Sequence, residues 1–169
     1  EERGGGGRGG GGVAEGRGVG EGEAGGDNIK ARPDTNGKVG ISGSGSGGRH
    51  TFRVDGRADG FDAAVELWGG RVVMGADDLS PAQPKAPIDM TDGLSAPLLG
   101  IFGNDDQSPS PEQVNQHEEA LKAAGKNYEF HRYDGAGHGF WYYDRPAYRP
   151  EQAMDSWGKT LTFFGENLS

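Results

Sequence analysis

A histidine and an aspartate in the C-terminal half of the sequence are the residues best suited to catalysis. His138 lies in the run DGAGHGF, where the flanking glycines let the backbone turn sharply and aim the imidazole back over the protein. Asp106 lies in the run GNDDQSP, and its carboxylate could accept a hydrogen bond from the imidazole Nδ1. A histidine oriented in this way acts as a general base. Because a lone histidine in a loop is usually just solvated, the prediction depends on its pairing with Asp106. The neighbouring Asp105 either supports this pair or has no part in it.

The third member of such a site would be a nucleophile. The sequence contains no cysteine, so covalent catalysis would need an oxygen or nitrogen nucleophile. The run GSGSGG at residues 43–48 places Ser44 and Ser46 among small residues, as a sharp turn between a strand and a helix requires. The same run could instead be a phosphate-binding glycine loop or a plain turn.

The other three histidines are weaker candidates. His50 follows the glycine-rich run, His117 lies on a predicted helix and His131 lies within a predicted strand, so we predict structural roles for them. No two of them have the spacing of zinc ligands together with a third ligand. We therefore expect no metal site.

The elements that position these residues alternate between strands and helices. Strands are predicted for residues 38–42, 61–68, 96–102 and 128–133. The third of these, APLLGIF, is a continuous apolar run typical of a buried parallel strand. In open sheets of this kind the working loops follow the carboxyl ends of the strands. The GSGSGG, GNDDQSP and DGAGHGF runs follow three of the four strands, so we expect their side chains to meet at one edge of the sheet.

Two helices have clear sequence signals. Ser110 is a suitable N-cap before Pro111, and Gly125 is a suitable stop. The inner face of this helix is predicted to consist of Val114, His117, Leu121 and Ala124. A second helix begins at Pro150 and carries an apolar stripe of Met154, Trp157, Leu161, Phe164 and Leu168. Helices of this length between strands predict an α/β fold, with a mostly parallel sheet and flanking helices.

The N-terminus is predicted to be a disordered, glycine-rich tail. Fourteen of the first 26 residues are glycine, and the few apolar side chains cannot offset the entropy cost of ordering. We divide the chain into a low-complexity tail at residues 1–30 and a folded domain at residues 31–169. The tail superficially resembles arginine-glycine segments that bind RNA, but its glutamates outnumber its arginines and it has no aromatic residue. A flexible linker is the favoured interpretation.

The overall charge also argues against a nucleic-acid partner. The sequence has 17 basic and 26 acidic residues, a formal net charge of −9. No stretch approaches the roughly 18 consecutive apolar residues of a membrane span, and the N-terminus lacks the pattern of a secretory signal. We expect a cytoplasmic protein without a membrane association.

Four runs, in order along the chain, resemble the dienelactone hydrolase family, whose members have the α/β-hydrolase fold. They are RPDTNGKVG with the glycine-rich turn ending GGRH, AAVELWGG, PLLGIFGNDDQSPSPEQV and YDGAGHGFWYYDRPAY. The resemblance covers about residues 31–168 and corresponds to the C-terminal half of the family fold. It implies a hydrolase of esters or lactones that needs no cofactor and uses a triad of cysteine or serine, aspartate and histidine. The family's acid falls on Asp106 and its histidine on His138.

The family's nucleophile falls on Gly45, which has no side chain with which to attack. The family pattern is G-x-C-x-G-G, and the two glycines that close it set the register. Ser46 is the preferred substitute, because a shift of the turn by one residue would bring its hydroxyl to the position of the nucleophile. Ser44 is a weaker candidate. The alternative is a turn without a nucleophile, and then the protein is a non-catalytic remnant or a binding or scaffold protein.

Three further features of the sequence concern the helix after the turn, the edge of the sheet and a possible pocket. The segment at residues 50–60 should be a buried helix after the turn, yet it contains four charged residues and two glycines. Without the first half of the family fold, the strand at residues 38–42 is expected at the edge of the sheet. The aromatic run FWYY at residues 140–143 with Arg145 could line a pocket for a carboxylate, although core packing is the favoured interpretation.

Overall fold

The sheet consists of parallel strands, as the sequence predicts. The computed structural model of the protein describes residues 15–169, and within them the strands are β1 (Gly40–Ser44), β2 (Ala63–Leu67), β3 (Leu98–Gly103) and β4 (Tyr128–Tyr133). Their spatial order is β1-β2-β3-β4, and each strand pairs in parallel with its neighbour. The predicted α/β class is therefore confirmed, and β1 lies at one edge of the sheet.

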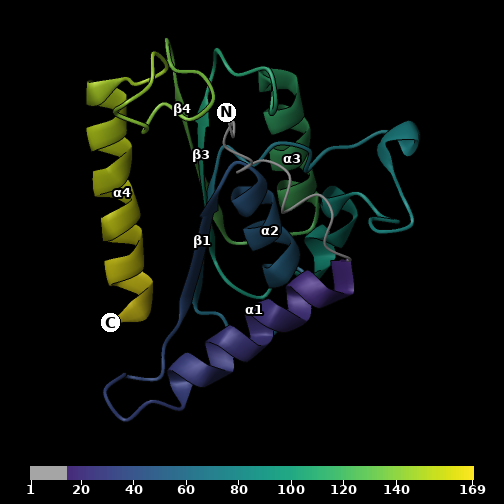
Figure 1. Ribbon diagram of the computed structural model, residues 1–169, viewed down its shortest axis with the longest axis vertical. Helices are drawn as coiled ribbons and strands as arrows, with labels where there is room; N and C mark the ends of the chain where they lie inside the picture. Colours follow the sequence, from purple (N-terminus) through teal and green to yellow (C-terminus); the bar gives the residue numbers. More distant parts are fainter. Residues whose placement is uncertain (1–14) are drawn as a thin grey trace, which may run out of the picture.

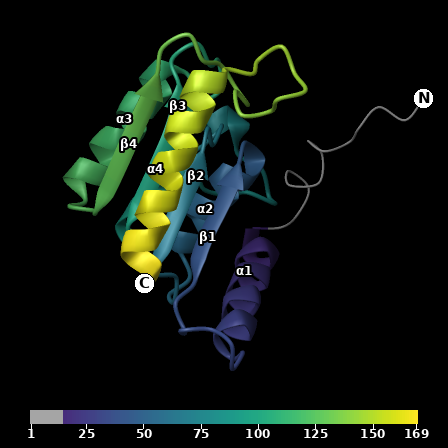
Figure 2. The ribbon, with the colours of Figure 1, turned by 90° about the vertical axis from the view of Figure 1, so that its left-hand side faces the viewer.

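Helices cover both faces of this sheet (Figures 1 and 2). α2 (Ser46–Asp55) and α3 (Pro111–Ala123) lie on one face, and α4 (Pro150–Leu168) lies on the other. The core is divided accordingly, because Leu98 of β3 joins the cluster on the α2 and α3 side, whereas Leu99 joins the cluster on the α4 side. This alternation is the period of two expected of a strand. Two short 3-10 helices, Ala76–Asp78 and Pro87–Gly93, lie between β2 and β3.

The segment predicted to be disordered is helical where the structure describes it. α1 (Glu15–Lys30) packs against α2, and Val19 is buried with Val54 in the same apolar cluster. A Cβ built at Gly22 would lie 2.9 Å from Val54 Cγ1, so glycine allows the two helices to approach closely. The prediction of disorder is therefore wrong for this segment, because a packing partner supplies the burial that its own composition lacks. Residues 1–14 lie outside the described residues.

α3 has the predicted ends, and its inner face is the predicted one except for Ala124, which lies just beyond the helix. The Ser110 hydroxyl accepts a hydrogen bond from the Gln113 amide at 3.4 Å, and the Gln113 side chain accepts one from the Ser110 amide at 3.0 Å. This reciprocal arrangement satisfies amide groups that have no partner within the helix. Val114, His117 and Leu121 are buried against the sheet.

α4 buries only part of its apolar stripe. Its buried residues are Ala153, Ser156, Thr160 and Phe163. By contrast, Met154 is 66% exposed, Trp157 is 46% exposed and Leu161 is 53% exposed. Small side chains on the buried face allow the helix to lie close to the sheet. The first three residues of the predicted stripe therefore face solvent, whereas Phe164 and Leu168 pack against the core.

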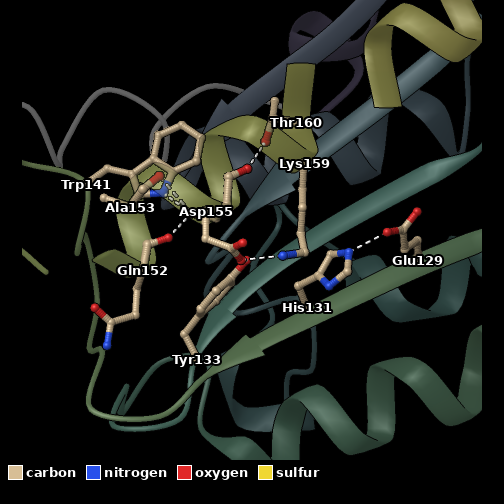
Figure 3. A network of polar contacts seen from close by, with 10 residues as sticks. Glu129, His131, Tyr133, Trp141, Gln152, Ala153, Asp155, Lys159 and Thr160 are labelled. Atoms are coloured by element: carbon tan, nitrogen blue, oxygen red, sulfur yellow. Dashed lines mark hydrogen bonds and ion pairs between the residues drawn. The ribbon is translucent and has the colours of Figure 1, made fainter. Parts of the chain in front are cut away.

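A network of polar side chains joins α4 to β4 (Figure 3). Tyr133 on β4 donates a hydrogen bond to Asp155 Oδ2 at 2.8 Å, and Asp155 also pairs with Lys159. Burial and the bond to the Asp155 carboxylate both raise the pKa of Tyr133. On the same strand, His131 pairs with Glu129, which agrees with the structural role predicted for this histidine.

The buried hydroxyl of Ser156 is expected to stabilise this side of the fold. It accepts a hydrogen bond from Trp141 Nε1 at 2.6 Å and donates one to the Gln152 carbonyl at 2.6 Å. Ser156→Ala would leave the half-buried indole N–H without its partner, so the free energy of unfolding should fall by about 1–3 kcal/mol. Urea unfolding measures the change, with Thr162→Ala at an exposed position of the same helix as the control. Equal stabilities of the two variants would contradict the expected role of Ser156.

Candidate active site

His138 and Asp106 form the pair that the sequence predicts. His138 Nδ1 lies 2.8 Å from Asp106 Oδ2. The Asp106 side chain is only 3% exposed, whereas the His138 side chain is 49% exposed and open to an incoming molecule. The second carboxylate oxygen, Oδ1, accepts a hydrogen bond from the Ser108 amide at 2.9 Å, which holds the carboxylate in place. The hydrogen bond that His138 donates to Asp106, together with the negative charge of that carboxylate, raises the pKa of His138 against the opposing effect of burial.

The pairing of β3 with β4 brings these two loops together. The strands are in register up to the pair Gly103 and Tyr133, after which each chain enters its loop. A Cβ at Gly103 would lie 2.2 Å from the Ala136 carbonyl oxygen, so only glycine allows the histidine loop to rest on the end of β3. The Asp105 amide then donates a hydrogen bond to that Ala136 carbonyl at 2.9 Å, which joins the two loops.

The sharp turn after β1 is made by Gly45. β1 continues to Ser44 rather than ending at residue 42, and α2 begins at Ser46. Gly45 has φ 56° and ψ −119°, a left-handed conformation of the kind found in the strained turns that present nucleophiles. A Cβ built on Gly45 would lie 3.3 Å from His138 Nε2. Gly45 therefore faces the imidazole nitrogen that is not bonded to Asp106.

The two serines beside Gly45 differ in their surroundings. Ser46 is the first residue of α2 and lines the same cavity as His138, but no hydrogen bond joins their side chains within the described residues. The Ser44 hydroxyl lies 3.0 Å from the Tyr142 hydroxyl, within hydrogen-bond distance. The structure thus brings Ser46, Asp106 and His138 to one cavity, while the one-residue shift that would make Ser46 the centre of the turn is absent.

The cavity beside His138 has a volume of about 380 Å³ and contains two arginines that sequence reasoning missed. It is lined by Ser46, Arg49, Gly70, Arg71, Asp106, Gln107, Ser108 and His138. Arg71 follows the carboxyl end of β2 and has φ 64°, which holds its side chain over the site from an unusual backbone conformation. The sequence signal was available, because Arg71 comes directly after the two glycines that follow the AAVELW strand.

The charged residues of α2 have partners from other parts of the chain. Arg49 is buried, and its Nη1 donates a hydrogen bond to the Gly70 carbonyl at 3.2 Å. The buried carboxylate of Asp55 accepts a hydrogen bond from the Ala96 amide at 2.9 Å, although burial still raises its pKa. The predicted buried helix at residues 50–60 is therefore helical and buried only as far as Asp55, and the other two charged residues, Arg57 and Asp59, are exposed beyond its end.

His117 is a core histidine, in agreement with the structural role predicted for it. It is 2% exposed and makes edge contacts with Phe52 and Phe130. Burial lowers the pKa of His117 to about 3, so the imidazole is neutral near neutral pH. Its Nδ1 lies 3.9 Å from Glu66 Oε2, and burial raises the pKa of that carboxyl well above its ordinary value.

The aromatic run after His138 divides between the core and the surface. Phe140 is fully buried and packs on Trp68, whereas Tyr143 is 83% exposed. The Arg145 guanidinium carbon lies 5.4 Å from the centre of the Tyr142 ring, and Arg145 is not among the residues that line the cavity beside His138. Arg145 therefore contacts the ring of Tyr142 and does not line the cavity beside His138, where it could have bound a carboxylate.

A second, larger hollow lies on the other side of the molecule. It has a volume of about 540 Å³ and is lined mainly by exposed residues of α4, together with Glu129. We place the candidate site at the smaller cavity, because only that one contains the His138 and Asp106 pair. Within residues 15–169 no three side chains gather as metal ligands, and no helix has the length and apolar character needed to cross a bilayer.

Comparison with known proteins gives a consistent result. A family model described as "Dienelactone hydrolase family" matches residues 14–168. A "Putative carboxymethylenebutenolidase" of Methylorubrum extorquens is 38% identical over 127 residues, which cover 75% of this chain and 42% of the relative. The protein of the same name from Salmonella typhimurium is 37% identical over 120 residues, covering 71% of this chain and 43% of the relative. The chain thus spans less than half the length of these curated relatives.

Two solved structures resemble the fold. A crystal structure titled "Putative Dienelactone Hydrolase" from Klebsiella pneumoniae matches with a TM-score of 0.74 and 31% identity, covering 82% of this chain and 58% of that one. Dipeptidyl peptidase 4 from Porphyromonas gingivalis matches with a TM-score of 0.76 but only 18% identity, over 92% of this chain and 23% of that one. The second similarity concerns the fold alone.

Proposed function

The chain belongs to the dienelactone hydrolase family, and on that premise we propose that it hydrolyses small esters or lactones with His138 as the general base. The single observation that supports this most strongly is the 2.8 Å contact between His138 Nδ1 and Asp106 Oδ2, which leaves Nε2 free to face the turn at Gly45. We expect no cofactor, nucleic acid or membrane to take part. A cytoplasmic location stays a prediction.

The proposed roles follow from the geometry. Asp106 orients the imidazole and stabilises the imidazolium that forms when Nε2 takes a proton. The first backbone amides of α2, beginning at Ser46, have no acceptor within the helix and can stabilise the oxyanion of the tetrahedral intermediate. The attacking oxygen is either the Ser46 hydroxyl, which the sequence favours, or a water molecule. Both sources require His138 to accept a proton.

Hydrolysis by the unmodified protein is the direct test of this proposal. We expect it to hydrolyse a short-chain p-nitrophenyl ester and a simple lactone, with circular dichroism confirming that the sample is folded. Release of p-nitrophenol and acid titration measure the two reactions. A folded protein that hydrolyses neither compound would contradict the proposal.

The lack of a side chain at Gly45 favours one alternative function, a non-catalytic protein that binds the same molecules. This function predicts saturable binding of an ester or lactone without any turnover. Isothermal titration calorimetry, with recovery of the unchanged compound afterwards, distinguishes the two functions. Loss of binding on filling the cavity through Ser108→Trp would locate the ligand beside His138.

The activity is expected to rise with pH, because His138 must be neutral to accept a proton. Its pKa is raised from the ordinary value of 6.5 by the hydrogen bond that it donates to Asp106, so kcat/KM should level off only above that raised pKa. In Asp106→Asn the imidazolium loses its negative partner, and the inflection of the pH profile should move to lower pH. An unchanged inflection would mean that Asp106 does not act on His138.

Arg71 is expected to favour substrates with a negative charge. Its half-exposed guanidinium lines the cavity and also bonds the Asp78 carbonyl at 3.2 Å. Arg71→Gln should lower the ratio of kcat/KM for an aryl hemisuccinate over the aryl acetate by roughly fivefold, a modest effect because solvent screens the charge. Arg145→Gln removes the same charge outside the cavity and serves as the control. Equal ratios in both variants would contradict a role for Arg71.

A further inference from the structure

We propose that the attacking oxygen is water, held at Gly45 where the family's nucleophile would stand, so that hydrolysis proceeds without an acyl-enzyme. This inference rests on the proposed ester or lactone hydrolysis and specifies its nucleophile. It would make the chain a hydrolase with a dyad of His138 and Asp106 in place of a triad.

The space required for such a water lies directly opposite His138 Nε2. The Cβ that Gly45 lacks would lie 3.3 Å from Nε2. Apart from the chain neighbours of Gly45, His138 is the only described residue with an atom within 4 Å of that point. This side of the imidazole is therefore open, and a water in van der Waals contact with the Gly45 Cα, beside the Cβ point rather than on it, is within hydrogen-bond reach of Nε2. The half-exposed imidazole leaves a path by which water and substrate can enter.

A water at this point also has further polar partners. The amides of Ser46 and Gly47 lie in the first turn of α2, where backbone N–H groups have no acceptor within the helix. A bound water needs two to four polar partners, which Nε2 and the neighbouring backbone can supply. The same amides lie close to where the oxyanion of an attacked carbonyl would develop.

Ser46 is less well placed than water to be the nucleophile. The conformation that presents a nucleophile belongs to Gly45, with φ 56° and ψ −119°, while Ser46 already lies within the helix. The Ser46 hydroxyl also makes no hydrogen bond to His138 within the described residues. Moving it to the tip of the turn would require the strand-to-helix connection to shift by one residue. The close packing at Gly43 opposes that shift. Ser44 would move into the place of Gly43, where a Cβ would lie 2.3 Å from the Gly47 carbonyl oxygen.

The reaction balances without a covalent bond to the protein. The water oxygen bonds to the carbonyl carbon as one of its protons passes to His138 Nε2. The tetrahedral intermediate then breaks its bond to the leaving oxygen, which takes the proton back from Nε2. An ester yields an acid and an alcohol, and a lactone yields a single hydroxy acid.

The test treats the protein with an alkyl fluorophosphonate, which reacts irreversibly with activated serines, and then follows turnover of p-nitrophenyl acetate. A serine protease serves as the positive control for the reagent. We expect the protein to keep its turnover and to show no added mass on any serine. Loss of turnover together with a modified Ser46 peptide would overturn the inference while leaving the proposed hydrolysis intact. No turnover before treatment would instead overturn the proposed function, and this inference with it.

A pair of glycine variants provides an independent test. Gly45→Ala adds a methyl group 3.3 Å from His138 Nε2, which displaces a water from the space between Gly45 and the imidazole, so turnover should fall by roughly a hundredfold. Gly125→Ala is the matched control, because Gly125 has a similar φ of 63° and nothing lies within 4 Å of its added Cβ. Both variants should show the circular dichroism of the parent. Full turnover in a folded Gly45→Ala protein would overturn the inference.

Discussion

Replacing His138 with alanine is expected to lower kcat/KM for ester hydrolysis by roughly two to four orders of magnitude. The effect is expected to be large because, in the proposed mechanism, His138 Nε2 accepts the proton from the attacking oxygen, whichever oxygen that is. The imidazole is half-exposed and is hydrogen-bonded to Asp106, so its removal should disturb the fold little. Initial rates over a range of ester concentrations measure the change.

His131→Ala is the control for this variant. His131 lies on β4, the strand that precedes the loop of His138, but it pairs with Glu129 in the network beneath α4 and does not line the cavity. Its replacement should leave kcat/KM within about twofold of the parent, since it neither contacts the substrate nor positions the dyad. A similar loss in both variants would show that the effect of His138→Ala comes from unfolding, and retained activity in His138→Ala would contradict the proposed mechanism.

Introducing serine at Gly45 is expected to create a nucleophile. The new Cβ would lie 3.3 Å from His138 Nε2, which brings the hydroxyl within reach of a hydrogen bond to that nitrogen. The left-handed backbone at this position would cost about 1–3 kcal/mol of stability, as in other strained nucleophile turns. We expect stoichiometric reaction with a fluorophosphonate at residue 45, and kcat/KM for p-nitrophenyl acetate higher by roughly a hundredfold.

Peptide mass spectrometry after the fluorophosphonate reaction checks the site of modification. The double variant Gly45→Ser with His138→Ala is the control, because it has the hydroxyl without the base and should react far more slowly. A burst of p-nitrophenol equal to one per protein would confirm that an acyl-enzyme forms at residue 45. A folded Gly45→Ser protein that reacts no faster than the double variant would show that Gly45 does not occupy the nucleophile position.

The sequence was sufficient to predict the sheet and the contact between His138 and Asp106 because both depend on local signals. The apolar run at residues 96–102 predicts a buried strand wherever it is placed, and the caps of α3 at Ser110 and Gly125 specify where that helix can begin and end. Parallel strands place their carboxyl ends at one edge, so the loops of Asp106 and His138 were expected to meet. The 2.8 Å contact between their side chains agrees with that expectation.

The sequence was not sufficient where packing between distant segments decides the outcome. Composition predicted disorder for the part of the chain that forms α1, but Val54 on α2 supplies the apolar surface against which Gly22 packs closely. Periodicity predicted an apolar stripe on α4, yet the helix buries Ser156 because Trp141 provides a donor for its hydroxyl. In both cases the residue that makes the contact lies in another part of the chain, on α2 for Val54 and in the loop before α4 for Trp141.

The sequence by itself determined the residue types available for chemistry: an imidazole at His138, a carboxylate at Asp106 and no side chain at Gly45. Only the tertiary structure decided which residue makes the turn after β1 and that Arg71 lines the cavity. The turn depends on how closely Gly43 can approach the Gly47 carbonyl, and the cavity depends on where three separate loops come together above the sheet. Those distances are set by packing of the whole chain, which no local run of residues specifies.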